Sequence, residues 1–171
     1  MSSTDPEAFE EFAHARTPHL FRSAWLLAGD RHLAEDLVQE TLAKMFRAWG
    51  GIRRIDNPAA YAQTVLARTY ISHRRRRSST ERPIADTPDR AAPEDDVTLR
   101  VLLIDALDAL DRIDRAVLVL RFFEDRSVEQ AALDLNQSRG AVRTRTNRAL
   151  SRLRTVLGDE ALSPLGVTRH D

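Results

Sequence analysis

The residues of this sequence best suited to chemistry are arginines grouped towards its C-terminal end. Six arginines and no acidic residue lie between Ser138 and Arg154, although the 171-residue chain as a whole balances 26 basic against 26 acidic residues. Arginine presents a planar fork of donors that fits a phosphate or a guanine edge, and Asn or Thr can read a base edge beside it. This composition favours recognition of nucleic acid.

Two short helices joined by a tight turn are expected to position these arginines. Ser127 followed three residues later by Gln130 is typical of a capping box, so a first helix is predicted to begin directly after Ser127. That helix is predicted to end at Asn136, a residue that tolerates the left-handed backbone conformation. Ser138 can cap the second helix. The stretch from Ser127 to Arg154 is therefore predicted to be a helix-turn-helix.

The second helix separates its apolar and polar residues. Its predicted core positions are Val142, Ala149, Leu153 and either Val156 or Leu157. Its predicted exposed positions are Arg139, Arg143, Thr144, Asn147, Arg148 and Arg152. Such a helix suits the DNA major groove. The alternative is a solvated basic helix that packs on a partner protein.

Other candidate sites carry less chemistry. Glu11 and His14 lie one turn apart, as in di-iron helical bundles, but His32 and Glu35 have the reverse order, so a second pair at the same spacing is missing. Acidic residues recur every third position at Asp105, Asp108, Asp111 and Asp114, a spacing that drifts around a helix and does not predict a metal site. No catalytic residue, metal or cofactor is predicted.

Bulk properties indicate an all-α protein that stays in the cytoplasm. The sequence has no cysteine, no apolar run of about 18 residues that could span a membrane, and an acidic N-terminus where a signal peptide would be basic and then apolar. Helical periodicity fills nearly every segment.

The N-terminal half is predicted to hold four helices, opened by the cap residues Asp5, Thr17, Asp30 and Asn57. The first is expected to end near Arg16, before Pro18 restarts the chain. The third is expected to run from Arg31 to about Trp49, where Gly50 and Gly51 end it. The fourth is expected to run from Pro58 to about Arg77.

A second group of basic residues belongs to this half. Arg53 and Arg54 lie in the predicted loop before the fourth helix, which ends in the run Arg74, Arg75, Arg76 and Arg77. A frayed, solvated helix end is one explanation of such a run; beside a second basic helix, nucleic acid is the explanation that we favour.

Residues 78–97 are predicted to form a flexible acidic linker, because they hold three prolines, six acidic residues and few apolar side chains. Helical patterns resume from Leu99 to Leu110 and from Arg112 to Phe123, and these helices are expected to pack on the helix-turn-helix.

The chain from Phe9 to Leu157 resembles the small extracytoplasmic-function (ECF) sigma factors of the sigma-70 family, in particular the sigma-E-like subfamily. The resemblance depends on AEDLVQETLAKMFRAW (34–49), on the helix from Tyr61 that ends in arginines, and on LDRIDRAVLVLRFFEDRSVEQAALDLNQSRGAVRTRTNRALSRLR (110–154). It implies two small helical domains: region 2 at residues 1–77 and region 4 at 98–158, followed by a tail at 159–171. Asn136 departs from the family pattern, which usually has Gly there.

The resemblance also implies roles for individual residues. The −35 promoter element is expected to be contacted by Ser138, Arg139, Arg143, Thr144, Arg145, Asn147 and Arg148, of which Arg139 and Arg145 are expected on phosphates. The −10 element is expected to be melted and held by Arg53, Arg54, Asn57, Tyr61, Arg74, Arg75, Arg76 and Arg77. Core RNA polymerase is expected to dock on Glu35, Asp36, Gln39 and Glu40.

The expected partners are the clamp helices of the largest polymerase subunit, the flap of the second-largest subunit, promoter DNA and an anti-sigma factor. The resulting interpretation is a sigma factor that directs core enzyme to promoters, associates with the nucleoid when bound to polymerase, and is not itself an enzyme. Two alternatives stay open: a stand-alone helix-turn-helix regulator that binds duplex DNA without polymerase, and a helical protein whose basic faces bind acidic partners.

Overall fold

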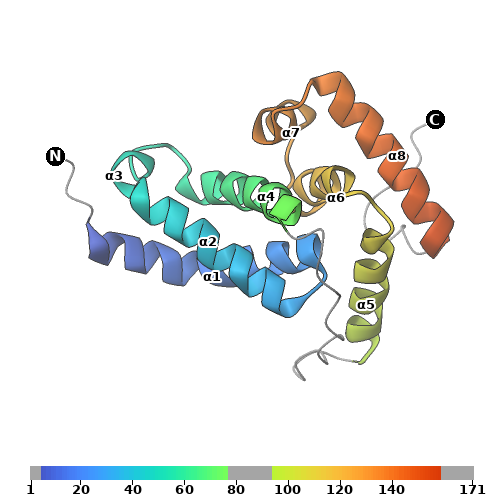
Figure 1. The fold of residues 1–171 in the computed structure, drawn as a ribbon, viewed down its shortest axis with the longest axis horizontal. Coiled ribbons are helices and arrows are strands. Elements are labelled where there is room, and N and C mark those ends of the chain that lie inside the picture. Colours follow the sequence, from blue (N-terminus) through green and yellow to red (C-terminus); the bar gives the residue numbers. More distant parts are fainter. Residues whose placement is uncertain (1–4, 77–93, 159–171) are drawn as a thin grey trace. The chain divides into compact units, whose positions relative to one another are not determined.

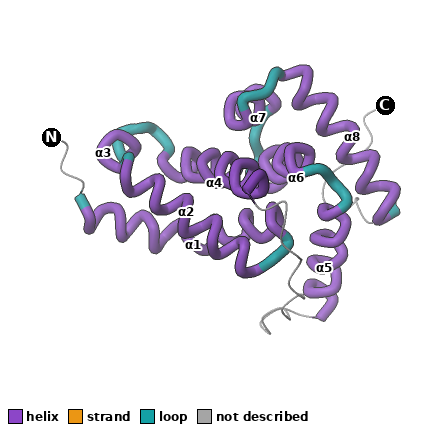
Figure 2. The backbone as a smooth tube through the Cα atoms, in the orientation of Figure 1, coloured by secondary structure: helices purple, strands orange, loops and turns teal. Residues whose placement is uncertain are grey.

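The computed structural model describes residues 5–76 and 94–158, and the side chains of residues 5–73 and 100–158. Within these ranges every regular element is helical, which confirms the all-α prediction (Figures 1 and 2). The chain divides into two compact units, here called the N-terminal unit (Met1–Ile84) and the C-terminal unit (Ala85–Asp171). Most of the predicted linker and the predicted tail lie outside the described residues.

Three long helices build the N-terminal unit: α1 (Pro6–Ala28), α2 (Arg31–Arg47) and α4 (Pro58–Arg76). The short α3 (Trp49–Ile52) lies between α2 and α4. Each long helix packs against the other two (Figure 1). The core between them is filled by fully buried side chains, the largest being Leu20, Leu27, Leu37, Met45, Leu66 and Tyr70.

The helix starts of this unit follow the predicted cap residues. Asp5, Asp30 and Asn57 each accept a hydrogen bond from the backbone N–H three residues later, at 3.2, 2.7 and 2.9 Å. Such caps satisfy amides that a helix leaves without a partner, and each contributes about 1 kcal/mol. The cap signals in the sequence are confirmed at these three positions.

The predicted break between Arg16 and Pro18 is wrong, because α1 runs without interruption across Pro18. A proline inside a helix removes a backbone donor and costs about 3 kcal/mol. Packing on both sides of Pro18 offsets this cost: Phe12 lies against Trp49 with ring centroids 4.8 Å apart, and Leu20 is fully buried. The exposed Pro18 lies on the outer surface of the helix.

The third predicted helix ends at Arg47, close to the expected end near Trp49, but the two glycines expected to follow it as a loop lie inside the separate helical turn of α3. Glycine is a poor helix former, so tertiary packing must hold this turn. The Trp49 ring supplies the packing: only 4% of the residue is exposed, and its centroid lies 5.3 Å from that of Phe9 in an edge-on arrangement.

Five elements build the C-terminal unit: α5 (Glu94–Asp108), α6 (Arg112–Leu118), the π-helical turn η1 (Val119–Phe123), α7 (Val128–Leu135) and α8 (Arg139–Leu157). Helix α8 packs against α5, α6 and α7. The buried apolar side chains that join these helices include Ala106, Val117, Leu120, Ala131, Val142 and Leu153.

The helix predicted from Arg112 to Phe123 does not stay regular to its end. It widens into a π turn at Val119, where the N–H of Glu124 donates to the Val119 carbonyl over 3.0 Å. Phe122 and Phe123 are 45% and 41% exposed as a result, although the apolar periodicity places Phe123 on the inner face.

An ion pair ties α6 to the end of α5. Arg115 is fully buried, and its Nη1 donates over 2.6 Å to Oδ1 of Asp108, whose side chain is 30% exposed. The carboxylate brings an opposite charge to the buried guanidinium. This pair therefore fixes how α6 leaves α5.

Candidate nucleic-acid interface

The predicted helix-turn-helix is present as α7 and α8. Ser127 and Gln130 form the reciprocal capping box at the start of α7, with both hydrogen bonds 3.1 Å long. Asn136 ends α7 in the left-handed conformation, at φ 53° and ψ 45°. The Ser138 hydroxyl then accepts from the N–H of Ala141 over 3.0 Å and opens α8. The turn chemistry predicted from the sequence is confirmed.

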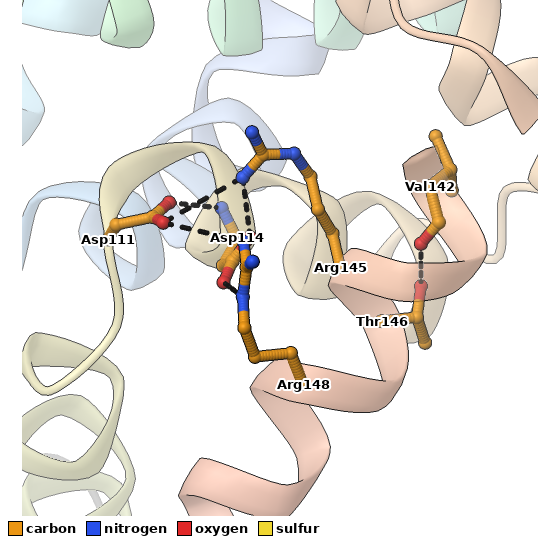
Figure 3. A network of polar contacts seen from close by, with 6 residues as sticks. All are labelled: Asp111, Asp114, Val142, Arg145, Thr146 and Arg148. Atoms are coloured by element: carbon orange, nitrogen blue, oxygen red, sulfur yellow. Dashed lines mark hydrogen bonds and ion pairs between the residues drawn. The ribbon is translucent and has the colours of Figure 1, made fainter. Parts of the chain in front are cut away.

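Buried residues on one side of α8 fix its rotation about its own axis. Val142, Ala149 and Leu153 are almost completely buried. Thr146 lies on the same side, and its hydroxyl donates to the Val142 carbonyl over 2.7 Å, which satisfies a polar group inside the core (Figure 3). The opposite side of α8 must therefore face outward.

The outward side of α8 carries most of the predicted DNA-contacting residues. Arg139, Arg143, Thr144 and Asn147 are all exposed. Arg139 has a weak ion pair with Glu129, 3.9 Å long between two largely exposed side chains. We call this set the α8 outer face. It combines charge for phosphates with an amide and a hydroxyl suited to base edges.

Two predicted residues of α8 have a different environment. Arg145 donates from Nη1 to Oδ1 of Asp114 over 2.7 Å, and Arg148 donates from Nε to Oδ2 and from Nη2 to Oδ1 of the same carboxylate, both over 2.9 Å (Figure 3). The side chain of Arg145 is 23% exposed and that of Arg148 is 55% exposed. Any phosphate contact by Arg145 would be shared with this carboxylate.

The electrostatics of this cluster are dominated by Asp114, whose side chain is only 5% exposed. Burial alone would raise its pKa, but hydrogen bonds and positive charge from Arg148 and Arg145 outweigh burial and hold the pKa below the usual 3.8. Hydrogen bonding to Asp114 also raises the pKa of Arg148. Asp114 and Arg148 are therefore both charged near neutral pH.

The sequence did not predict this cluster of Asp114 with two arginines, although it shows the regular spacing of the acidic residues. Asp111 caps α6 by accepting from the N–H of Asp114 over 2.9 Å, and it lies 3.7 Å from both Arg145 and Arg148. Of the regularly spaced acidic residues, Asp108 thus pairs with Arg115, whereas Asp111 and Asp114 share Arg145 and Arg148. Asp114 lies 31 and 34 residues from the two arginines in the chain, and no local sequence pattern predicts a contact over that separation.

Four of the eight predicted melting residues lie at the segment that joins α3 to α4 or on the first turn of α4. Arg53, Arg54 and Asn57 are exposed, and Arg53 lies 3.6 Å from Asp5 in a partly exposed ion pair. Tyr61 on the first turn of α4 is 38% exposed. The side chains of Arg74, Arg75 and Arg76, and the whole of Arg77, lie outside the described residues.

Aromatic side chains of α1, α2 and α3 pack together next to this segment. Phe9 packs edge-on against Phe46, with centroids 5.1 Å apart, and both Phe9 and Phe12 contact Trp49. The pairing of Phe9 and Phe12 with Trp49 became apparent only from the tertiary structure. This aromatic cluster holds α3 and so fixes where the segment with Arg53 and Arg54 begins.

The predicted docking residues lie on α2 but differ in exposure. Asp36 and Gln39 are exposed. Glu35 pairs with Arg31 over 3.1 Å and Glu40 pairs with Lys44 over 3.2 Å, both as partly exposed pairs one turn apart. Together they make an acidic and polar strip on the solvent side of α2, which we call the α2 strip.

The described residues hold neither a metal-binding group nor a membrane-spanning helix. Over that part of the chain, no three His, Cys, Asp or Glu side chains are grouped so that they could hold a metal ion. No described helix has the length and apolarity to cross a membrane. Glu11 and His14, the pair weighed as di-iron ligands, are both exposed on α1.

Comparison with known families assigns both units. The family model described as Sigma-70 region 2 matches residues 12–80, and the one described as Sigma-70, region 4 matches residues 106–155. The first match spans α1 to α4, and the second spans the Asp114 cluster and the helix-turn-helix.

Individual relatives align over most of the chain. The RNA polymerase sigma-E factor of Streptomyces avermitilis is 36% identical over 167 residues, covering 95% of this chain and 92% of that protein. The ECF RNA polymerase sigma factor SigL of Mycobacterium tuberculosis is 36% identical over 160 residues, covering 88% and 86%. A solved structure, the sigma factor RpoE in complex with the anti-sigma factor NepR from Bartonella quintana, is similar with a TM-score of 0.73 and 25% identity, covering 90% of this chain and 99% of that one.

Proposed function

The chain belongs to the sigma-70 family and is an RNA polymerase sigma factor of the extracytoplasmic-function type, and from this we propose how its two units share promoter recognition. The C-terminal unit reads the −35 element, and the N-terminal unit opens and holds the −10 element. We assign region 2 to residues 1–77, the linker to 78–97 and region 4 to 98–158. The observation that carries this proposal is the α8 outer face, which a helix-turn-helix presents to solvent.

The −35 element would be read by α8 lying in the major groove. Arg143, Thr144 and Asn147 extend from the α8 outer face at positions one turn or less apart, so all three can reach one stretch of base edges. Ser138 and Arg139 stand at the N-terminal end of α8, where the helix dipole adds to the attraction for a phosphate.

The −10 element would be melted at the segment that joins α3 to α4. Melting requires an aromatic surface for an extruded base and cations that follow the single strand. Tyr61 supplies a partly exposed ring on α4, and Arg53 and Arg54 supply the cations next to it in the chain. We propose that Arg74, Arg75, Arg76 and Arg77 also contact the DNA of the −10 element.

Core RNA polymerase would dock on the α2 strip through the clamp helices of its largest subunit, while the flap of the second-largest subunit would hold the C-terminal unit. Asp36 and Gln39 project from α2 into solvent, whereas the helix buries Leu37 and Met45 in its own core. A rigid helix with separate inner and outer faces is well suited to such docking.

A protein partner that keeps the factor inactive is a further part of the proposal. The structurally similar RpoE was solved with an anti-sigma factor bound. We extend that type of partner to this chain. We also propose that the chain has no enzymatic activity and needs no cofactor, since its family comprises transcription initiation factors and the polymerase supplies the catalysis.

Run-off transcription tests this function against its rivals. Core enzyme supplemented with the protein should produce promoter-dependent transcripts, and mapping their 5′ ends on genomic DNA would give the −35 and −10 sequences. Tight binding to duplex DNA without any such transcripts would instead indicate a stand-alone helix-turn-helix regulator. Crosslinking to DNA that is absent at every salt concentration would indicate a protein that binds only acidic partners.

A further inference from the structure

The carboxylate of Asp114 holds Arg148 in a defined orientation. The guanidinium donates along one edge, from Nε and Nη2, to the two oxygens of Asp114 at 2.9 Å each (Figure 3). A bidentate pair fixes both the position and the plane of the guanidinium. The side chain of Arg148 is nevertheless 55% exposed, so the fixed group stays accessible from solvent.

The geometry of the guanidinium leaves a second edge for recognition. Asp114 accepts along the lateral edge, from Nε and Nη2, so the end edge formed by Nη1 and Nη2 is not the one it uses; Oδ2 of Asp111 lies 3.7 Å from Nη2. A guanine is read by two parallel donors that face its O6 and N7 atoms, which the end edge can provide. The contact with Asp114 is therefore compatible with a base contact by the same arginine.

We propose that Asp114 is a positioning residue that orients Arg148 towards one base pair of the −35 element and thereby sets specificity at that base pair. This inference rests on the proposed function of the C-terminal unit, and it goes beyond it by placing a specificity determinant on α6, outside the helix-turn-helix.

Two neighbouring contacts and its burial keep Asp114 itself in place. Its backbone N–H donates to the Asp111 side chain over 2.9 Å, Arg145 donates to its Oδ1 over 2.7 Å, and its side chain is 5% exposed. A free arginine side chain loses much rotamer entropy when it binds DNA. An arginine that is already fixed loses less and tolerates a wrong base less well.

The same carboxylate places a negative charge near the DNA backbone. Removing that charge should leave non-specific binding equal or stronger, since non-specific binding depends on phosphate attraction. The inference therefore separates two quantities: loss of Asp114 should reduce discrimination at one base pair without weakening binding to unrelated DNA.

The test compares Asp114→Asn with the matched control Asp111→Asn. In Asp114→Asn one oxygen becomes an N–H₂ donor, so the two donors of Arg148 can no longer both be accepted, while Arg145 can keep its bond to Oδ1. Asp111→Asn removes the same charge from a neighbouring carboxylate that lies 3.7 Å from Nη2 of Arg148 but makes no bidentate pair with it, and Asn preserves the helix cap. The assay is competitive binding of the reconstituted holoenzyme to promoters that vary at each −35 position.

Arg148→Ala should abolish the preference of the holoenzyme for one base pair at a single −35 position. At that position we expect the wild type to favour the correct base pair by about tenfold. Asp114→Asn should reduce this preference to about twofold or less, and only there, while Asp111→Asn should retain it. In the Arg148→Ala background, Asp114→Asn should have no further effect, because coupled residues are not additive.

Unchanged preference in Asp114→Asn, an equal loss at every −35 position, or a further loss in the Arg148→Ala background would each overturn the inference. These outcomes differ from failure of the proposed function, which would show as a lack of promoter-dependent transcripts from the wild-type holoenzyme. If transcripts form but Arg148→Ala alters no single position, promoter direction stands and only the role of Asp114 falls.

A second measurement needs no substitution at Asp114 that could unfold the unit. Nitrogen-15 relaxation of the arginine Nε–H groups in the full chain should give Arg148 an order parameter near that of rigid backbone, about 0.8. Arg143 on the α8 outer face should fall below about 0.6. Equal mobility of the two side chains would contradict a fixed Arg148.

Discussion

The turn of the helix-turn-helix gives the sharpest stability prediction, because a single residue determines its geometry. Asn136 has φ 53° and ψ 45°, and within the described residues Asp125 is the other non-glycine with positive φ. An ordinary L-residue is destabilised in this conformation by about 1–2 kcal/mol, whereas Gly is not and Asn is less affected. The order of stability at this position should be Gly, then Asn, then Ala.

The magnitude follows from the backbone. The left-handed turn allows the N–H of Gln137 to donate to the Ala132 carbonyl over 2.9 Å, so the turn must form for α7 to end where it does. Gly and Ala should therefore differ by more than about 1 kcal/mol, with Asn between them. In a unit of this size that free energy corresponds to about 4–8 °C in melting temperature.

The assay is thermal and urea unfolding of the full chain, followed by circular dichroism and by an amide-exchange probe in α7 and α8. Gln137→Ala is the matched control: it changes the next residue, whose φ is not positive, and should shift the melting temperature little. If Asn136→Ala were as stable as Asn136→Gly, the left-handed turn would not exist in solution and our account of how α8 is oriented would be refuted.

Three further predictions concern the proposed surfaces. Asp36→Lys with Glu40→Lys should abolish association with core enzyme while leaving the helical circular dichroism unchanged, since like charges one turn apart cost only about 0.2–0.5 kcal/mol. Arg143→Ala should weaken promoter binding about tenfold without lowering the melting temperature, because its side chain is exposed. Unfolding at a series of pH values should show a contribution from Asp114: its pKa is lower folded than unfolded, so its ion pairs stabilise the C-terminal unit above about pH 4 and this stabilisation is lost as the pH falls through the lowered pKa.

Each of these has its own control. Glu10→Lys with Glu11→Lys reverses two exposed charges on α1, so loss of core binding there as well would show that the effect is not specific to the α2 strip. A lower melting temperature in Arg143→Ala would mean that this arginine stabilises the fold. The stability difference between wild type and Asp114→Asn should shrink as the pH falls below about 4, and a constant difference would exclude linkage to this carboxylate.

The caps and the turn of the helix-turn-helix were predictable from the sequence because they depend on residues close together in the chain. The capping box at Ser127, the left-handed Asn136 and the Ser138 cap all depend on residues three or four positions apart, and the structure has each of them. The same holds for the apolar side of α8, with Val142 and Leu153 buried as its periodicity predicts.

The errors arose where distant residues override local preference. The periodicity and propensity of residues 16–18 and 50–51 predict breaks, but packing of Phe12 and Trp49 holds both stretches helical. The π turn at Val119 also has no signal in the sequence pattern. In each case the missing information was which side chain of another helix lies opposite.

The same reasoning explains why the arginines of α8 could not be sorted from the sequence. Arg143, Arg145 and Arg148 lie on one helix and share one side-chain chemistry, yet the first is exposed and the other two meet a carboxylate that is 31 and 34 residues away in the chain. The rotation of α8 relative to the first turn of α6 determines which arginines meet this carboxylate. Val142 and its buried neighbours set that rotation. Because the rigid core fixes that rotation, a substitution on α6 can alter the orientation of a side chain on α8 without touching the helix itself. Under the proposed role of Asp114, base specificity would depend on the packing of α6 against α8 as well as on the residues that meet the DNA.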